Sequence, residues 1–348
     1  MDLADLDRRG GEWLRGEGSR AEVVISSRVR LARNLAGYLF ASRAPEETRR
    51  EIAVRLQERL SDLGLTTKQL YVDLEDADRL DARFLVERHL ISRELEAGGG
   101  PRGVAFGSDE VVSVMVNEED HLRIQAIRAS LALDEAWQAA IAVDHDLERD
   151  LEFAASTRYG YLTACPTNVG TGLRASVMLH LPALVHLKQI EKVFHACSKT
   201  GLTVRGFYGE GTMASGDLYQ ISNQVTLGRT EDEILSNLRN MLPRILEYEE
   251  ACRQELASRG RVKLEDKAHR CLALLQSART LTSEEAMQFL SGVRLGIVMG
   301  VLKDVDFAEV NELFVLTQPA HLQKLEGRAL DPEDRDVRRA AFVRHCLG

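Results

Sequence analysis

The chain has 348 residues, 44% of them apolar and 28% charged, which is the composition of a globular protein long enough for two domains. Its 45 basic and 54 acidic residues give a formal net charge of -9, and this sign argues against a protein that coats nucleic-acid phosphates non-specifically. The acidic start of the chain has neither the basic end nor the apolar run of a secretory signal, and no apolar stretch is long enough to cross a membrane. We therefore expect a cytoplasmic location, with no membrane partner and no direct nucleic-acid partner.

The five cysteines lie far apart along the chain and include no CxxC pair. An odd and widely spaced set argues against a disulfide framework and against a structural zinc site. We expect reduced thiols.

Helical and strand patterns are mixed, at uneven spacing, between residues 20 and 228. Because this alternation is irregular, it favours an α+β fold with an antiparallel sheet over a doubly wound parallel sheet. The longest helices are predicted near residues 46–60, 131–150 and 182–200. Strands are predicted at residues 23–31, 69–74, 111–116, 121–128, 161–165, 173–181, 203–209 and 221–227.

Beyond about residue 230 the strand patterns disappear, and helical patterns continue to the end of the chain. We place a boundary near residue 255. This predicts two domains, residues 1–255 with the mixed fold and residues 256–348 with helices alone.

The sequence lacks the nucleotide-binding motifs of familiar mechanism. It has no GxxxxGK[ST] loop and no HRD with DFG, and the GTG of Gly170–Gly172 lacks the third glycine of a dinucleotide-binding turn. The common ATP-binding folds are therefore disfavoured.

The first unusual segment is ISSRVRLAR, in which Arg28 and Arg30 lie two residues apart in a predicted strand. Alternate residues of a strand face the same side. Two guanidinium groups on one face repel each other unless an anion lies between them, and phosphate matches their planar, bidentate donors. The alternative is a solvated edge strand with two salt bridges, and this segment taken alone favours that alternative.

A second segment, NEEDHLR at Asn117–Arg123, follows a predicted strand and places three carboxylates beside a histidine and an arginine. Residues of this kind also form ordinary polar turns. A divalent metal site that includes His121 is a third interpretation, although the spacing matches no familiar ligand signature.

Two glycine-containing loops complete the set. CPTNVGTGLRAS at Cys165–Ser176 leads into a strand that carries Arg174, and VRGFYGEG at Val204–Gly211 contains Arg205 and Glu210. Glycines of this kind can bring backbone close to a ligand, although each loop alone could be an ordinary turn. Four segments that place arginine or glutamate at strand ends and glycine loops, in an otherwise acidic chain, indicate one local site for an anion.

These segments resemble the phosphagen (guanidino) kinases, which include creatine and arginine kinases, over about residues 20–230. The resemblance implies a glutamine-synthetase-like antiparallel sheet core flanked by helices, plus a C-terminal all-helical domain. The chain is most similar to the bacterial protein-arginine kinases within that family. The motifs that carry the resemblance are SSRVR (26–30), VERHLIS (86–92), NEEDHLR (117–123), CPTNVGTGLR (165–174), RGFYGEG (205–211), ISNQVTLG (221–228) and RDVRRA (335–340).

The resemblance also implies the chemistry, in which ATP with Mg²⁺ phosphorylates the guanidinium group of arginine. A guanidinium has a pKa far above neutrality and bears only donors, so a base must accept a proton before nitrogen attacks phosphorus. Glu119 and Glu210 correspond to the two glutamates that clamp the guanidinium in the resembling kinases, and Cys165 to the family's reactive cysteine. For Cys165 the alternative is a small apolar residue in a turn.

The same motifs predict the ATP site. A loose, metaphosphate-like transition state spreads charge over the phosphoryl oxygens, and arginines can stabilise that charge. Phosphates and water supply most ligands of Mg²⁺, so we expect no metal ligand from protein side chains. The predicted ATP-binding residues are Ser27, Arg28, Val29, Arg30, His89, Arg123, Arg174 and Arg205.

A short N-terminus favours a protein substrate. The small-molecule kinases that the chain resembles carry a helical domain before the SSRVR-like strand, and here that strand begins at Ser26. An open pocket would admit an arginine on a polypeptide. The alternatives are a kinase for free arginine or another small guanidine, and a catalytically idle adaptor that reads phosphoarginine. The intact glutamates and arginines argue against the adaptor.

Near the C-terminus, Asp331 and Pro332 match the N-cap and first position of a helix. Arg335 and Arg339 then share a face, with Asp336 three residues before Arg339. Spacing alone favours an exposed helix with salt pairs. The resemblance implies an allosteric phosphoarginine pocket made by these three residues, since arginine suits the phosphoryl group and aspartate the guanidinium.

The resemblance further implies partners. These are protein substrates with exposed arginine, a second copy of the chain in a homodimer, a zinc-containing activator protein, a heat-shock repressor as target and a Clp-type AAA+ unfoldase. In that setting the phosphorylated arginine marks proteins for Clp-type proteolysis in a stress response.

Overall fold

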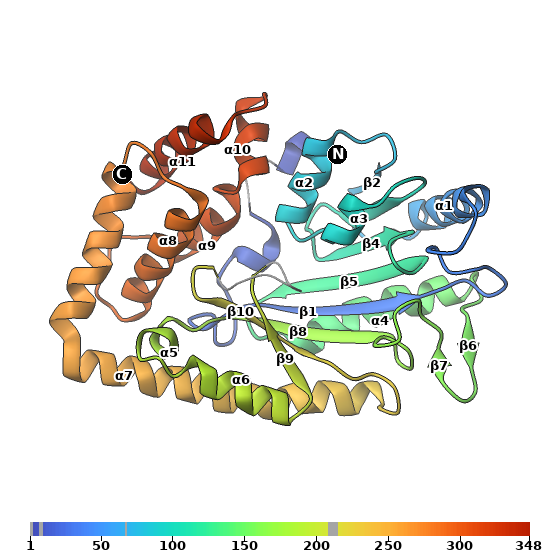
Figure 1. Ribbon diagram of the computed structural model, residues 1–348, viewed down its shortest axis with the longest axis horizontal. Helices are drawn as coiled ribbons and strands as arrows, with labels where there is room; N and C mark the ends of the chain where they lie inside the picture. The colour runs from blue at the N-terminus through green and yellow to red at the C-terminus, as the bar shows by residue number, and fades with distance from the viewer. Residues whose placement is uncertain (1–2, 7–9, 67, 208–214) are drawn as a thin grey trace.

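The computed structural model describes residues 3–6, 10–66, 68–207 and 215–348 (Figure 1). Its centre is an eight-stranded sheet in the order β2-β3-β4-β5-β1-β8-β10-β9, in which neighbouring strands are antiparallel. The prediction of an α+β antiparallel fold is therefore confirmed. The strands are β1 (Val24–Arg33), β2 (Gln69–Asp73), β3 (Gly103–Gly107), β4 (Val112–Val116), β5 (Leu122–Ala129), β8 (Leu173–His180), β9 (Leu202–Arg205) and β10 (Leu218–Asn223), and a separate hairpin pairs β6 (Ala155–Ser156) with β7 (Gly160–Tyr161).

Eleven helices are present in the described part of the chain, together with two short 3₁₀ segments. In the first two thirds they are η1 (Leu3–Leu6), η2 (Glu12–Leu14), α1 (Glu46–Ser61), α2 (Arg79–Glu87), α3 (Arg93–Ala97), α4 (Leu133–Glu148), α5 (Pro182–His186) and α6 (Ile190–Lys199). The remainder are α7 (Glu231–Ser277), α8 (Ser283–Val298), α9 (Phe307–Leu316), α10 (Pro319–Glu326) and α11 (Pro332–Leu347). None of the described helices is long and apolar enough to span a bilayer.

The sequence patterns missed some elements. β3 was not predicted, because GVAFG is buried at all five positions and so shows no polar and apolar alternation. The strand predicted at 161–165 was wrong, since only Tyr161 of that stretch is extended, in the β6–β7 hairpin. The helix predicted at 182–200 is two helices, α5 and α6, with Lys188 between them at a positive φ of 56°.

One face of the sheet forms the main hydrophobic core. α4 packs on β1 and β5, and the first half of α7 packs on β8 and β10. Val29 on β1, Ile124 on β5 and Val177 on β8 are fully buried there. This core fixes the positions of the strands, and therefore of the side chains on the other face of the sheet.

The other face of the sheet carries apolar side chains at one end of the strands and arginines at the other end. At one end it carries apolar side chains, among them Ile127 on β5 and Met178 on β8. Trp13 of η2 and the helices α7, α8, α9 and α11 pack against these residues in a single apolar cluster. Figure 1 shows α8 to α11 grouped at the upper left, beside the sheet, with α10 next to α2. The C-terminal helices thus cover one part of this face, and α2 and α3 pack on its β3–β4 side.

The long helix α7 joins the two parts of the chain. It passes along the sheet and turns toward α8–α11 at a bend, where Gly260 has the non-helical angles φ -148° and ψ 30° (Figure 1). Residue 255, where we expected a boundary, lies inside α7 shortly before this bend. The division at residue 255 stays a prediction.

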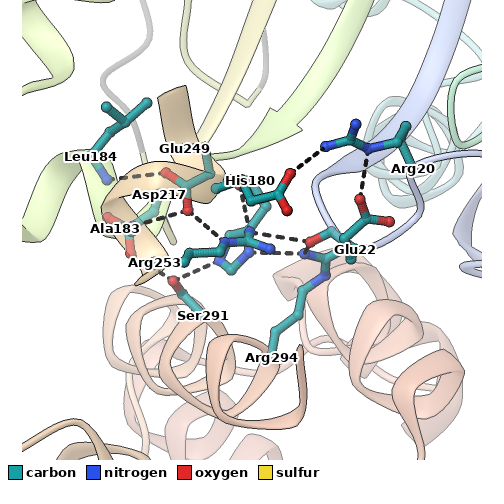
Figure 2. Close-up of polar contacts among 11 residues, drawn as sticks. Arg20, Glu22, His180, Ala183, Leu184, Asp217, Glu249, Arg253, Ser291 and Arg294 are labelled. Atoms are coloured by element: carbon teal, nitrogen blue, oxygen red, sulfur yellow. Dashed lines mark hydrogen bonds and ion pairs between the residues drawn. The ribbon is translucent and has the colours of Figure 1, made fainter. Parts of the chain in front are cut away.

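Buried polar groups join the C-terminal helices to the sheet (Figure 2). Arg294 of α8 is fully buried and donates to the carbonyl oxygens of Ala21 (2.7 Å) and Glu22 (3.2 Å) and to the side-chain oxygen of Asn311 (2.8 Å). It also donates to Nδ1 of His180, at 2.9 Å, at the end of β8. These contacts satisfy the donors of a charge that would otherwise be costly to bury.

The contact with Arg294 sets the tautomer of His180. Because arginine only donates, Nδ1 of His180 must accept, and Nε2 therefore carries the proton and donates to Ser291 Oγ at 2.9 Å. Ser291 in turn donates to Asp217 Oδ2 at 2.6 Å, directly before β10. On α7, Glu249 accepts from Nε of Arg253 at 2.8 Å, next to this chain of bonds (Figure 2).

A second polar contact joins α10 to α2. The carboxylate of Glu87 accepts from the backbone amides of Ala320 (2.8 Å) and His321 (2.9 Å), which are the first free donors of α10. The next residue, Arg88, is buried and paired with Glu110, and it donates to the carbonyl of Leu6 at 2.9 Å. The end of α2 is thereby fixed to both the C-terminal helices and the sheet.

The buried histidine predicts how stability depends on pH. Burial, and then the charges of Arg294 and Arg253, lower the pKa of His180 well below its usual value. The unfolded chain takes up a proton below about pH 6.5 that the folded chain does not, so stability is complete above that pH and is lost as pH falls, by up to about 1.4 kcal/mol per pH unit. Urea unfolding at pH 7.5, 6.5 and 5.5 should show this fall in the wild type and a shallower one in His180→Gln.

The matched control is His345→Gln, which changes an exposed histidine near the C-terminus. It should keep the wild-type dependence on pH. Equal slopes for the wild type and His180→Gln would contradict the assignment.

Candidate active site

The register of the strands brings five arginines to one face of the sheet. Arg30 lies opposite Arg174 across β1 and β8, so the two side chains point to the same side. Arg28 shares that side because it is two residues from Arg30, and Arg123 shares it because its partner on β1 is Ala32, two residues further on. Arg205 joins through β10, where its partner Gln220 is paired in turn with Met178 of β8. Only the tertiary register makes this cluster, since the arginines come from four separate strands.

The cluster is strongly positive. Burial, and then the charges of Arg174, Arg123 and Arg205, lower the pKa of Arg28 to about 9. Burial and the neighbouring Arg28 also lower the pKa of Arg30 well below its usual value. Within the described residues no carboxylate lies at ion-pair distance from Arg28 or Arg30, and Nε of Arg30 has no hydrogen-bond partner. Since guanidinium groups in proteins stay protonated at neutral pH, an anion bound between Arg28 and Arg30 would offset their repulsion.

One arginine of the cluster has a carboxylate partner. Arg123 pairs with Glu118, whose side chain is buried and also accepts from the hydroxyl of Ser92. Burial alone would lower the pKa of Arg123, but Glu118 and then Glu119 raise it above its usual value. Arg123 therefore lies between the other four arginines and the carboxylates, and Glu118 fixes its position.

Glu119 is at the edge of the cleft. Burial raises the pKa of Glu119, the charge of Arg123 opposes that rise, and the neighbouring carboxylates Glu118, Asp120 and Glu94 add to it. A carboxylate with a raised pKa is a better proton acceptor. Glu119 and Cys165 line the same cleft as the five arginines.

The turn that carries Glu119 is held from both sides. Asp120 accepts from Nδ2 of Asn34 and from the backbone amide of Ala164, both at 2.6 Å. His121 accepts through Nδ1 from the amide of Leu35 (3.1 Å) and donates through Nε2 to the carbonyl of Leu39 (2.9 Å). Both ring nitrogens of His121 are therefore committed to backbone, and it is a structural residue.

This arrangement excludes the metal site that the NEEDHLR motif allowed around His121. The described residues contain no group of three His, Cys, Asp or Glu side chains placed to hold a metal ion. The turn does position carboxylates, but it directs Glu118 and Glu119 toward an arginine and a cleft.

The loop of Cys165 closes the same end of the cleft. Sγ of Cys165 lies 3.0 Å from the hydroxyl oxygen of Thr167. The sequence left open whether the loop glycines approach a ligand or form an ordinary turn, and two of them approach backbone. Gly172, at φ 65°, would place a Cβ only 2.6 Å from the carbonyl oxygen of Ala32, and Gly170, at φ 113°, would place one 2.9 Å from that of Thr226. The glycines therefore let the loop pack against β1 and against the segment after β10.

His89 lies at the border between the arginine half and the apolar half of the face. Its ring makes edge contacts with Trp13 (5.1 Å between centroids) and Phe207 (5.0 Å). Burial, and then the charge of Arg28, lower the pKa of His89 to about 3, so the ring is neutral. Nε2 of Gln125 donates to the carbonyl of His89 at 2.6 Å and holds its backbone at a positive φ of 58°.

The other predicted site residues fall in different places. Ser27 and Val29 point to the opposite side of β1, where Ser27 donates to the carbonyl of Ser130 at 2.8 Å and Val29 is in the core. Their side chains therefore do not line the cleft, and only their backbone can contact a nucleotide. Glu210 lies outside the described residues.

The motifs did not single out two residues of the cleft. Gln220 is buried, lines the cleft beside Arg205, and has no described hydrogen-bond partner for its side-chain oxygen. Glu118 was only one of three acidic neighbours in its motif. The signal for Gln220 was the alternation of Gln220 and Ser222 with apolar residues on one strand, which predicts a polar face opposite the core.

The C-terminal residues Arg335, Asp336 and Arg339 lie together on α11. Asp331 caps the helix by accepting from the amide of Asp334 at 2.8 Å, as the sequence predicted. Arg339 is only 1% exposed, and it donates to the carbonyls of Thr317 (2.8 Å) and Leu281 (2.7 Å) and to Asp336 (2.6 Å). The predicted salt pair of Arg339 with Asp336 is therefore confirmed, but the prediction of an exposed helix face is wrong for Arg339, while Arg335 is half-buried.

Comparisons with known proteins agree with this geometry. Residues 51–252 match the model of the ATP:guanido phosphotransferase C-terminal catalytic domain, and residues 261–348 match that of the protein-arginine kinase McsB C-terminal domain. The protein-arginine kinase of Halothermothrix orenii is 46% identical over 100% of this chain and 99% of its own, and that of Bacillus subtilis is 43% identical over 96% and 93%. The chain belongs to the protein-arginine kinase branch of the ATP:guanido phosphotransferases. It is therefore a phosphotransferase that uses ATP.

Solved structures show the same fold in more distant guanidino kinases. The duplicated taurocyamine kinase of Schistosoma mansoni, with bound transition state analog components, aligns with a TM-score of 0.60 and 26% identity over 76% of this chain and 38% of its own. Lombricine kinase aligns with a TM-score of 0.58 and 24% identity over 70% of this chain and 71% of its own, and shows the fold alone. The phosphagen-kinase-like core is thus confirmed.

The unpaired charge of Arg30 predicts a conflict between stability and binding. Arg30→Met should stabilise the nucleotide-free protein by about 1 kcal/mol, because it removes repulsion and a buried charge without a partner. The same change should weaken ATP binding about tenfold or more, since it removes a charge-assisted hydrogen bond to phosphate. Thermal unfolding with and without nucleotide, together with titration calorimetry, measures both effects.

Arg270→Met removes an exposed arginine of α7 and is the control for net charge. It should leave both quantities nearly unchanged. A destabilised Arg30→Met protein with normal ATP affinity would remove Arg30 from the site.

Proposed function

We propose that this protein transfers the γ-phosphoryl group of ATP to a guanidinium nitrogen of arginine residues in other proteins. The observation that carries the proposal is the face of five arginines that ends at Glu119, a carboxylate whose pKa is raised. A guanidinium nitrogen placed at Glu119 would lie beside a γ-phosphoryl group held by the arginines. Donor and acceptor sites therefore meet in one cleft.

In the transfer step the acceptor nitrogen forms a bond to the γ-phosphorus, and the bond from that phosphorus to the β–γ bridging oxygen breaks, so that ADP leaves. Glu119 accepts the proton that the guanidinium nitrogen gives up. Glu210 is proposed as the second carboxylate of the guanidinium clamp on the strength of its motif alone. Cys165, at the same end of the cleft, would contact the guanidinium from the other side.

The arginines act on the phosphates. Phosphate oxygens would be bound by Arg28, Arg30, Arg174 and Arg205. Arg28 and Arg30 need not break a salt bridge to do so, because no carboxylate of the described residues lies at ion-pair distance from them. The site is therefore preorganised for the charge of the transition state. Arg123, oriented by Glu118, would bridge the phosphoryl group and the acceptor site. When bound, Mg²⁺ would supply further positive charge, and we propose that phosphate and water provide its ligands.

A protein substrate is proposed because the full-length relatives are named protein-arginine kinases. From the resemblance of its motifs to the bacterial protein-arginine kinases we also propose a homodimer and marking of substrates for a Clp-type AAA+ unfoldase in a stress response, and from its acidic start a cytoplasmic location. A zinc-containing activator protein and a heat-shock repressor are proposed partners that the resemblance suggests.

The function has a direct test. The protein is incubated with Mg-ATP and casein, or with free arginine at matched concentration of guanidinium, and acid-labile phosphate on arginine is located by mass spectrometry. Casein should be the better acceptor. Faster phosphorylation of free arginine would favour the small-guanidine kinase, and no phosphoarginine at all would favour the idle adaptor.

Removing the proposed base separates chemistry from binding. Glu119→Gln should reduce kcat at least 100-fold, because the amide cannot accept the proton, and should leave the affinity for ATP nearly unchanged. Phosphoarginine formation and ATP titration are measured on the same preparation. Glu47→Gln, on the exposed side of α1, is the control for the loss of one carboxylate. Normal turnover of Glu119→Gln would end its assignment as the base.

We also propose that Arg335, Asp336 and Arg339 bind phosphoarginine as an allosteric ligand. Arg339 holds the backbone of two segments, at Thr317 and Leu281, so its removal would disturb the fold, and Arg335→Met is the sharper test. It should weaken binding of free phosphoarginine at least tenfold in calorimetry with the active site blocked by a nucleotide analogue. Arg338→Met, on the exposed side of the same helix, should bind normally. Equal affinities in both variants would leave α11 a structural helix.

A further inference from the structure

A serine of the C-terminal helices contacts the paired ends of two central strands. Ser291 of α8 is buried, and its hydroxyl accepts from Nε2 of His180 at 2.9 Å and donates to Oδ2 of Asp217 at 2.6 Å (Figure 2). His180 is the last residue of β8, and Asp217 directly precedes β10. The first residue of β10, Leu218, pairs with His180. Ser291 therefore bridges β8 and β10 at the end of their hydrogen-bonded ladder.

A serine between a histidine and an aspartate could also be a nucleophile, because hydrolases activate serine through histidine. That mechanism needs a histidine nitrogen that accepts the proton of the serine hydroxyl. Nδ1 of His180 accepts from Arg294, so Nε2 carries a proton and donates it to Ser291. Ser291 is therefore not activated as a nucleophile, and its role is to link α8 to the two strands.

The turn before β10 has a conformation that depends on support from α8. Gly216 and Asp217 both have a positive φ, of 63° and 56°. Glycine adopts this region freely, whereas aspartate does so less readily. The carbonyl oxygen of Asp217 accepts from the amide of Leu181 at 2.9 Å, and a Cβ at Gly216 would lie 2.9 Å from the carbonyl oxygen of Met287 on α8. The turn thus packs directly on α8, and the bond from Ser291 holds Asp217 in this conformation.

The position of β10 decides which side chains face the cleft. Gln220 of β10 pairs with Met178 of β8 on one side and with Arg205 of β9 on the other, and both Gln220 and Arg205 line the arginine-bearing cleft. Side chains alternate along a strand, so a shift of β10 by one residue would turn Gln220 to the opposite face. Within the described sheet β9 is an edge strand that pairs with β10 alone. The placement of Arg205 therefore depends on that of β10.

We propose that Ser291 is a positioning residue for phosphoryl transfer, which holds the start of β10 against the end of β8 and thereby places Arg205 toward the phosphates. The inference rests on the proposed function, since it takes Arg205 as a ligand of the phosphate oxygens. It gives the C-terminal helices a part in building the nucleotide site, although no described residue of these helices lines the cleft.

Two variants remove the link from opposite sides. Ser291→Ala deletes the hydroxyl, but it also leaves the buried Nε2 of His180 without an acceptor, which destabilises the fold. Asp217→Gly deletes only the carboxylate, and glycine keeps the positive φ without strain. Each variant should weaken ATP binding about fivefold in titration calorimetry and lower kcat on casein by a similar factor. Asp217→Asn retains an acceptor oxygen and tolerates this φ, and it should stay within about twofold of the wild type.

A double-variant cycle tests whether the link acts through Arg205. Arg205→Met should weaken ATP binding about tenfold, and adding Asp217→Gly to it should produce little further loss, because the side chain that the link positions is already gone. Losses that add in full would show that the link acts elsewhere, and they would overturn the inference.

The matched control is Ser258→Ala, since Ser258 is exposed on α7 and donates to the carbonyl of Glu255 within its own helix. It should leave ATP affinity, kcat and urea unfolding unchanged. The inference is wrong if Asp217→Gly is less stable in urea but has normal ATP affinity and kcat, because the bond then has a structural role alone.

Failure of the inference and failure of the proposed function are distinguishable. Normal ATP binding by Arg205→Met would remove Arg205 from the proposed phosphate site, and the inference with it. A normal Asp217→Gly protein beside a defective Arg205→Met protein would overturn the inference alone and leave the phosphate site as proposed.

Discussion

Repulsion among guanidinium groups on one half of a sheet face is the constraint on which the rest of this structure depends. Arg30 and Arg174 face each other directly across two strands, and Arg28 is one alternation away. Burial and mutual repulsion lower the pKa values of Arg28 and Arg30. Such a face persists only because the ladder of backbone hydrogen bonds and the core beneath it hold the strands. An anion with several oxygens, such as the phosphates proposed above, would relieve this repulsion.

The apolar half of the same face explains why the C-terminal helices pack where they do. Ile127 and Met178 would be exposed without these helices and Trp13. Their attachment is reinforced by Arg294, which reaches from α8 to His180 and to the chain before β1. The helical region therefore forms one wall of the face that also carries the cleft.

His89 is where the two halves meet. Its ring contacts Trp13 on one side and Phe207 on the other, and the two residues before it, Glu87 and Arg88, are bonded to α10 and to Glu110. A shift of α10 would be transmitted to the backbone next to His89, because Glu87 accepts from the first amides of that helix. The C-terminal helices are thus linked through Glu87 to the backbone beside His89, which lines the arginine-bearing cleft.

The loops at the opposite end of the cleft are anchored by buried polar groups. Asp120 accepts from Asn34, and the hydroxyl of Thr226 donates to the carbonyl of Thr167. These contacts hold the turn that carries Glu119 and the loop that carries Cys165 in place.

The sequence by itself determined which chemical groups are present and much of the local structure. Alternation of Arg28 and Arg30 predicted a shared face, the pattern of strands predicted an antiparallel sheet, and Asp331 with Pro332 predicted the start of α11. Short, fully buried β3 gave no such signal, because it has no polar side to alternate with.

Only the tertiary structure decided which of these groups act together. Local pattern cannot show that Arg205 and Gln220 join Arg174 through strand pairing, since register is set by contacts between distant segments. Nor can it show that His121 is committed to backbone while Glu119 faces the cleft, or that Arg339 is buried. The sequence specifies the type of each residue. The burial of a charged side chain and the identity of its hydrogen-bond and ion-pair partners depend on how distant segments pack, and these two properties decide what each charged group can do.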